Sequence, residues 1–177
     1  MKYILAAIPA ELVGHELDPE EYTVWFTGVG KINAAMYATL ACAQKDCEVV
    51  INYGTAGTLN PELAGQLIQV GKVMQRDMDA RPLSDLGITP MDNEFAGTIV
   101  LSNSAYTCST GDNFVTETPE LESDIVDMEL YAIAKVCKHF KKGLVCYKYI
   151  TDLADKEASA HWEENHTKGS EAFLAMT

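Results

Sequence analysis

The sequence predicts an α/β fold of three layers, α/β/α, around a central mixed, largely parallel β-sheet. Apolar runs typical of strands alternate along the chain with segments of helical patterning, which is the order expected when helices cover a parallel sheet. The 177 residues, 47% of them hydrophobic, suit one domain with a substantial core. No repeat, low-complexity tract or linker divides the chain, so residues 1–177 are predicted to form a single domain.

Strands are expected where apolar residues run together for a few positions between turn signals. In chain order these runs are Tyr3–Ile8, Thr23–Thr27, Glu48–Asn52, Leu67–Gln75, Thr98–Ser102 and Gly143–Ile150. Helical patterning predicts helices over Lys31–Ala43, Asp127–Phe140 and Ser159–Met176. Asp77–Phe95 is rich in Asp, Pro and Gly and is predicted to be a long loop. Ligands of open α/β sheets bind at the carboxyl ends of strands, so the chemistry is expected there.

Composition excludes several classes of protein. A net charge of −13 argues against binding to nucleic acid, which needs clustered Lys and Arg. Five cysteines, an odd number without a CxxC pair, indicate reduced thiols in the cytoplasm. The start, MKYILAAIPAEL, reaches Glu11 too early for a secretory signal and predicts a first strand, and no apolar run has the ~20 residues of a membrane span.

Two suggestive motifs fail on their spacing. FTGVGKINAA joins a strand to a helix as a dinucleotide-binding loop does, but Asn33 stands where that motif needs Gly or Ala, so a tight turn is predicted. His161 and His166 in HWEENH are five residues apart, roughly 140° around a helix, whereas zinc-binding pairs are four apart. Neither a cofactor nor a metal is predicted, and no cysteine or Gly-x-Ser-x-Gly motif indicates a covalent nucleophile.

Four segments at strand ends or helix starts carry polar residues that suit either structure or ligand binding. NYGTAGTL and STGDNFV could be turns that need glycine, or backbone that closes around a small ligand beside Thr55 and a stacking Phe114. In YKYITDLAD, Asp152 could cap a helix or serve in a site. In VDMELYAIAKVC, acids favour a helix start, and Met128 between Asp127 and Glu129 would also suit a pocket wall.

Together these segments resemble the nucleoside phosphorylase and nucleosidase superfamily, and within it the 5′-methylthioadenosine/S-adenosylhomocysteine nucleosidases. The resemblance spans Met1 to Asp155 and rests on AAIPAEL, TGVGKINAAMYATL, INYGTAGTLNPEL, STGDNFV, VDMELYAIAKVC and YKYITDLAD. The Met-Glu pair at the helix start and the Ser/Thr-Asp pair at the strand end are its specific parts. It implies the phosphorylase/hydrolase-like form of the predicted fold.

The resemblance implies a role for each matching residue. Glu11 would activate water at the sugar carbon, and Asp152 would protonate the leaving base at N7. Phe114 and Met128 would sandwich the purine, and Glu129 would accept hydrogen bonds from the ribose 2′- and 3′-hydroxyls. Asp127 would cap the helix. Thr55, where the family has Ser, and Lys148, where it often has Arg, would position the water, and the neighbouring Ala56, Gly57, Val115 and Thr151 complete the expected substrate-binding set.

The implied reaction is hydrolysis of the N-glycosidic bond of a purine nucleoside. One carboxyl group acting as acid and another as base is the arrangement that glycoside hydrolases use at a related centre. Two rivals stay open: phosphorolysis, and nucleoside binding without catalysis. The superfamily's phosphorylases place an Arg before the Gly-Ser/Thr segment, where this sequence has Asn52 and Tyr53, which favours hydrolysis. Both carboxylates are present, which argues against a protein that only binds.

The substrate is expected to be adenine-based, with a 5′-thioether as one form it could take. The segment Gln75–Gly87 differs from the family's usual loop, so the sequence does not fix which purine nucleoside is bound. By resemblance the chain is expected to form a homodimer, because the family completes its 5′ pocket with apolar residues from a neighbouring subunit.

Overall fold

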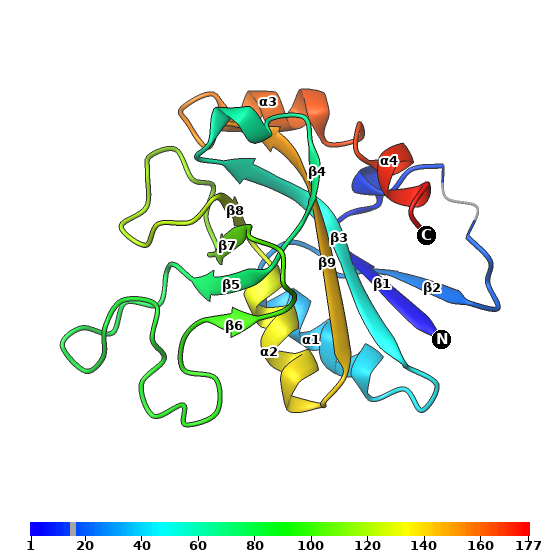
Figure 1. Ribbon diagram of the computed structural model, residues 1–177, viewed down its shortest axis with the longest axis horizontal. Coiled ribbons are helices and arrows are strands. Elements are labelled where there is room, and N and C mark those ends of the chain that lie inside the picture. The colour runs from blue at the N-terminus through cyan, green and yellow to red at the C-terminus, as the bar shows by residue number, and fades with distance from the viewer. Residues whose placement is uncertain (15–16) are drawn as a thin grey trace.

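The computed structural model describes residues 1–14 and 17–177, in which strands and helices alternate along most of the chain (Figure 1). The strands are β1 (Lys2–Ala6), β2 (Tyr22–Phe26), β3 (Val49–Thr58), β4 (Leu67–Gln69), β5 (Lys72–Gln75), β6 (Ile99–Val100), β7 (Thr107–Thr110), β8 (Ile125–Asp127) and β9 (Gly143–Asp152). The helices are α1 (Lys31–Cys42), α2 (Leu130–His139), α3 (Ala158–Asn165) and α4 (Ser170–Leu174), with 3-10 turns η1 (Pro9–Glu11) and η2 (Pro61–Leu63).

The nine strands of the described residues form one mixed sheet. Its order is β2-β1-β3-β8-β7-β5-β6, and β9 pairs with both β3 and β4. The pairs β1–β2, β1–β3, β3–β9, β5–β7 and β7–β8 are parallel, whereas β3–β8, β4–β9 and β5–β6 are antiparallel. The predicted mixed, largely parallel sheet is confirmed.

Helices cover both faces of the sheet because alternate strand residues point to opposite sides. On one face Tyr3 and Leu5 of β1 pack with α1 and α2, which lie side by side (Figure 1). On the other face Ile4 packs with Tyr53 of β3 and with Phe173 of α4, whose ring stacks on that of Tyr53 with centroids 4.2 Å apart. This arrangement gives the three layers that the sequence predicts.

β3 is the strand on which the other parts of the sheet converge. Its first half pairs with β1, its end pairs with β8, and β9 pairs with it from Val49 to Gly57. The register with β9 shifts between Ala56 and Gly57, so Gly57 lies opposite Asp152 of β9 and opposite Val126 of β8. The carboxyl ends of β3 and β9 therefore meet the start of α2 in one place.

The predicted strand Leu67–Gln75 is wrong in one respect, because the structure divides it into β4 and β5. β4 pairs with β9 and β5 pairs with β7, and the chain changes partner at Val70 and Gly71. The Gly71 backbone passes against the Ser104 carbonyl group so closely that a Cβ atom would overlap it. An apolar run does not reveal such a change of partner.

Other predicted boundaries shift for local reasons. β7 and β8 were not predicted, since one is polar and the other has three residues. The helix predicted from Asp127 starts at Leu130, because Asp127 ends β8. The helix predicted over Ser159–Met176 is two, α3 and α4, and at Gly169 between them a side chain would overlap the Tyr149 ring.

The remaining strands match the predicted runs with shifted ends, and β3 and β9 continue beyond their predicted ends to Thr58 and Asp152. The predicted loop Asp77–Phe95 contains neither helix nor strand. None of the helices among the described residues meets the length and hydrophobicity that a transmembrane helix requires.

Candidate active site

A pocket lies where β3, β8 and β9 end beside η1, α2 and α3. Every predicted site residue other than Lys148 lines it, namely Glu11, Thr55, Ala56, Gly57, Phe114, Val115, Met128, Glu129, Thr151 and Asp152. These residues come from segments more than 100 positions apart in the sequence, and the sheet register brings them together. The lining also includes Ala7, Ile8, Val29, Arg76, Asn113, Val126, Asp127 and Trp162.

Glu11 is buried at one side of the pocket, in the turn that follows β1. Its Oε1 accepts hydrogen bonds from the backbone N–H of Thr55 (2.9 Å) and from the Thr55 hydroxyl (2.7 Å). Its Oε2 accepts from the N–H groups of Ala7 (3.1 Å) and Ile8 (3.2 Å). Four donors thus fix both oxygens, and this is the pattern of an ionised carboxylate, which only accepts hydrogen bonds.

Asp152 ends β9 and lines the same pocket. Its Oδ2 accepts from the Thr151 hydroxyl (2.8 Å) and its Oδ1 from the Ala154 N–H (3.0 Å). Burial raises the pKa of this carboxyl group above its ordinary value, and these two donors oppose the rise. α3 starts at Ala158, so Asp152 does not cap it, which excludes the structural role weighed for this residue.

Gly57 leaves the space that the Asp152 carboxyl group occupies. A Cβ atom at Gly57 would lie 2.5 Å from Oδ1 of Asp152 and 3.2 Å from Val126. The register of β3 with β9 shifts at this glycine, and a larger residue here would displace the Asp152 carboxyl group.

The turn from β8 into α2 presents Met128 and Glu129 to the pocket. Glu129 Oε1 accepts a hydrogen bond from the Gly30 N–H at 2.9 Å, and this backbone group precedes α1. Gly30 has a φ of 94°, a value that glycine adopts readily. Burial raises the pKa of Glu129 to about 7, the Lys148 charge opposes this rise, and the Asp127 charge adds to it.

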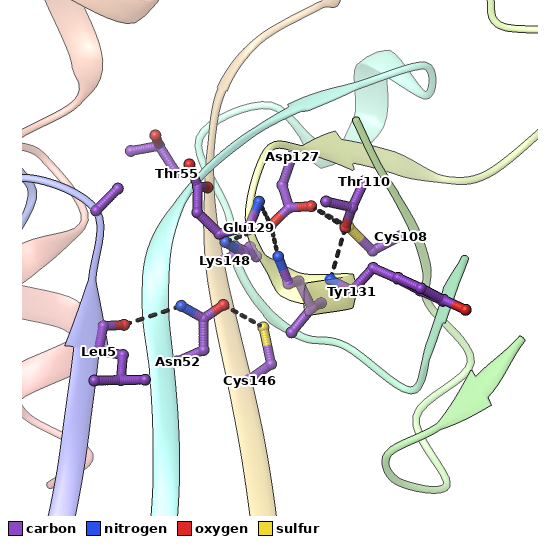
Figure 2. Close-up of polar contacts among 12 residues, drawn as sticks. Leu5, Asn52, Thr55, Cys108, Thr110, Asp127, Glu129, Tyr131, Cys146 and Lys148 are labelled. Atoms are coloured by element: carbon purple, nitrogen blue, oxygen red, sulfur yellow. Dashed lines mark hydrogen bonds and ion pairs between the residues drawn. The ribbon is translucent and has the colours of Figure 1, made fainter. Parts of the chain in front are cut away.

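Asp127 stands beneath this turn and holds the start of α2, as predicted. Its Oδ2 accepts from the Leu130 N–H (2.8 Å) and the Glu129 N–H (3.3 Å), and its Oδ1 accepts from the Thr110 hydroxyl (2.5 Å; Figure 2). Burial alone would raise its pKa, but Lys148 and these donors hold the pKa below its ordinary value.

Lys148 is not in the pocket lining, although it was predicted to position water there. Its Nζ lies 2.9 Å from Asp127 Oδ2, and both side chains are buried, 1% and 0% exposed (Figure 2). Burial alone would lower the pKa of Lys148, yet the charge of Asp127 raises it above its ordinary value, so the group stays cationic. We therefore assign Lys148 to the support of the β8–α2 turn.

Of the lining residues that were not predicted from the sequence, Arg76 and Trp162 make side-chain hydrogen bonds that tie parts of the pocket together. Arg76 follows β5, and its guanidinium donates to the backbone carbonyl groups of Ser109, Gly111, Asn113 and Asp127 at 2.5 to 3.1 Å. Its place at the end of an apolar run was the available signal. Trp162 of α3 donates from Nε1 to the Thr55 hydroxyl at 3.0 Å and meets Phe114 edge to face. It lies in the HWEENH segment, where the sequence pattern draws attention to the two histidines and not to the tryptophan.

In the described part of the chain, no group of three or more His, Cys, Asp or Glu side chains could hold a metal ion. His161 lies near Glu157, and His166 lies against backbone carbonyl groups of its own helix. The five cysteines are free and buried.

Comparisons with known proteins show the family to which the chain belongs. The family model for the phosphorylase superfamily matches residues 11–177. The 5′-methylthioadenosine/S-adenosylhomocysteine nucleosidase of a Marinomonas species is 31% identical over 163 residues, which cover 78% of this chain and 71% of the relative. That of Anoxybacillus flavithermus is 30% identical over 175 residues, 84% of this chain and 75% of the relative.

Solved structures share the fold. The Helicobacter pylori 5′-methylthioadenosine/S-adenosylhomocysteine nucleosidase, solved with butyl-thio-DADMe-Immucillin-A, superposes with a TM-score of 0.85 at 21% identity, over 98% of this chain and 94% of that one. The native futalosine hydrolase of the same organism has the same TM-score, identity and coverage.

The buried ion pair generates a prediction about stability. Replacing Lys148→Met leaves Asp127 charged and buried without its cation, so the free energy of unfolding in urea is expected to fall by about 3–5 kcal/mol. The partly exposed pair of Lys135 and Asp92, with N and O 2.5 Å apart, is the matched control. Lys135→Met is expected to lower the free energy of unfolding far less, because water screens this pair. Equal losses in the two variants would contradict the role given to Lys148.

Proposed function

The chain belongs to the phosphorylase superfamily, and we propose that it is an N-glycosyl hydrolase that uses water to split a purine nucleoside into free base and sugar. One observation carries the proposal: two buried carboxyl groups, Glu11 and Asp152, line one pocket in different environments. Glu11 accepts four hydrogen bonds, whereas burial raises the pKa of Asp152. Such a difference suits a base and an acid acting on one substrate.

In the proposed reaction the bond between C1′ and N9 breaks and its electron pair leaves with the purine. Asp152 delivers a proton to N7, so the base departs neutral rather than as an anion. Water attacks C1′, and Glu11 takes a proton from it. The products are the neutral base, protonated at N7, and the sugar with a new hydroxyl group at C1′, and the net effect on the protein is one proton lost by Asp152 and one gained by Glu11. Positioned acid catalysis of this kind contributes ~10²–10⁴-fold to a rate.

Binding is assigned to the rest of the lining. Phe114 and Met128 lie on the pocket wall and offer apolar surfaces to the two faces of a purine. Glu129, as a carboxylate, accepts hydrogen bonds from the 2′- and 3′-hydroxyls of ribose. Relatives named as 5′-methylthioadenosine/S-adenosylhomocysteine nucleosidases support an adenine-based substrate with a 5′-thioether.

The contacts of Arg76 favour hydrolysis over phosphorolysis. Among the described residues that line the pocket, Arg76 is the only one with a cationic side chain. It would therefore be the partner of a phosphate dianion. Its two terminal nitrogens already donate to four backbone carbonyl groups. A phosphate would have to displace these bonds to gain a charge-assisted contact.

A homodimer fits the outer surface of α1. Ile32, Met36 and Leu40 are spaced four residues apart and are 84%, 52% and 49% exposed, so they form an apolar stripe on one helix face. Val29, 49% exposed, extends the stripe to the pocket. A second copy seated on the stripe would cover both the apolar surface and this side of the pocket mouth.

We also place the protein in the cytoplasm, where five free thiols would stay reduced.

The first prediction concerns Asp152. Asp152→Asn keeps the size of the side chain and removes the proton donor, so release of base from a panel of purine nucleosides, followed by chromatography, should fall at least ~100-fold. Glu11→Gln should fail equally. Substrate binding by calorimetry and the melting temperature should change little. Base release above about a tenth of the wild-type rate would exclude Asp152 as the acid. Binding by the wild-type protein without any released base would indicate a nucleoside-binding protein.

The second prediction concerns the pH dependence of binding. The pKa of Glu129 is raised to about 7, so its carboxylate form is lost as the pH falls through 7. Affinity for a purine ribonucleoside should therefore rise with pH, by roughly tenfold per pH unit at most, and should level off above a pH of about 7. Calorimetry in the Asp152→Asn background avoids turnover and the titration of Asp152. Adding Glu129→Gln should flatten the profile, and a profile that persists in that variant would exclude Glu129 as its source.

The third prediction concerns assembly. Light scattering at micromolar concentration should give twice the monomer mass of 19.4 kDa. Ile32→Glu should shift the protein toward monomer, because it places a charge at the most exposed position of the apolar stripe. Leu83→Glu is the control, since Leu83 is equally exposed (81%) and lies in the Asp77–Phe95 loop. A wild-type protein that is monomeric under these conditions would exclude the dimer.

A further inference from the structure

A chain of two hydrogen bonds links α3 to the carboxylate of Glu11. Trp162 donates its indole N–H to Thr55 Oγ1 at 3.0 Å, and Thr55 Oγ1 donates to Glu11 Oε1 at 2.7 Å. Trp162 is 107 residues from Thr55, and Thr55 is 44 residues from Glu11. All three side chains line the pocket, so the chain of bonds runs along its wall.

Several contacts hold the indole ring in place. Its ring stacks on that of His166, with centroids 4.6 Å apart and planes 20° apart. Phe114 meets it edge to face, with centroids 6.2 Å apart. Asn165 fastens the same helix to the end of β9 by donating to the Thr151 carbonyl group at 2.9 Å. The direction of the indole N–H is therefore set by packing and not by Thr55 alone.

The Thr55 hydroxyl is the adjustable partner of Glu11. A carboxylate offers about four lone-pair sites, and Glu11 uses four for the donors it has in this structure. Three of these donors are backbone N–H groups that the fold holds still, at Ala7, Ile8 and Thr55. The fourth is the hydroxyl, which can rotate about its C–O bond. Only this donor can give up its site on Glu11 to a water molecule without moving the backbone.

We propose that Trp162 is a positioning residue for this base, acting through Thr55; this rests on the proposed hydrolysis. With a lone pair of Oγ1 engaged by the indole N–H, the Thr55 hydroxyl acts as a donor toward the site. In this structure it donates to Glu11. When water enters, the hydroxyl turns to donate to the water oxygen, and the water donates one proton to Glu11. Trp162 thus sets the direction in which the hydroxyl donates, and the nucleophile is left with Glu11 as its acceptor.

The test removes the indole N–H and keeps an aromatic ring. Trp162→Phe should lower kcat roughly fivefold, the effect of one hydrogen bond, because the ring contacts survive but the hydroxyl is no longer oriented. KM should stay within about twofold, as expected for an interaction made mainly in the transition state. Thr55→Ser keeps the hydroxyl, so Trp162→Phe should lower kcat by the same factor in that background as in the wild-type protein.

A double-mutant cycle separates positioning from a wall contact. Thr55→Val removes the hydroxyl at nearly constant shape, and in that background Trp162→Phe should have no further effect on kcat. If Trp162 only shaped the pocket, its effect would be the same in both backgrounds. Additive effects, or a loss confined to KM, would overturn the proposal.

A readout independent of catalysis is available because the chain has two tryptophans. In ¹H–¹⁵N spectra, Thr55→Val should move the indole N–H signal of Trp162 upfield and leave that of Trp25, which packs against Tyr3 and Tyr37, unchanged. An unmoved Trp162 signal would overturn the contact itself. If Thr55→Val moves the Trp162 signal but the wild-type protein releases no base, the contact stands and the proposed function fails, and with it the role of Trp162 in catalysis.

Discussion

The site depends on the buried ion pair between Lys148 and Asp127. Lys148 belongs to β9 and Asp127 ends β8, so the pair joins the strand that carries Asp152 to the turn that carries Met128 and Glu129. Asp127 is also held by the Thr110 hydroxyl of β7 and caps α2 through the Leu130 N–H. A buried pair of this kind is weak evidence for net stability, but removal of one partner leaves an uncompensated charge. The pair therefore constrains where the turn can lie.

The same cation shapes the electrostatics of the pocket above it. Lys148 lowers the pKa of Glu129 while burial raises it, and the balance places that pKa at about 7. Asp152 is farther along β9, and for it burial is the largest effect, which raises its pKa. One fold thus holds three carboxyl groups, Glu11, Glu129 and Asp152, in three environments. The proposed division into base, sugar binder and acid follows from these environments, not from the residue types.

The sequence predicted the segments at the strand ends because their content is local: glycines where a side chain would collide, as at Gly57, and the Met-Glu pair at the start of α2. The missed features depend on distant partners. The sequence does not show that Lys148 forms an ion pair with Asp127. It also does not show that Arg76 donates to backbone carbonyl groups 33 to 51 positions away. Hydrophobic periodicity does not reveal the change of strand partner at Gly71, and β8, with three residues, is too short to show a period. Trp162 lies in the site through contacts with residues distant in sequence, Thr55 and Phe114, and α3 is also held to β9 by Asn165.

The claim that water is the nucleophile can be tested by isotope. A purine nucleoside that the protein splits is incubated with it in H₂¹⁸O, with and without inorganic phosphate, and the sugar product is measured by mass spectrometry. Hydrolysis predicts one ¹⁸O atom in the sugar and a rate that phosphate does not change, because the terminal nitrogens of Arg76 are already bound to backbone carbonyl groups. A sugar 1-phosphate without ¹⁸O, formed at a rate that depends on phosphate, would contradict the account.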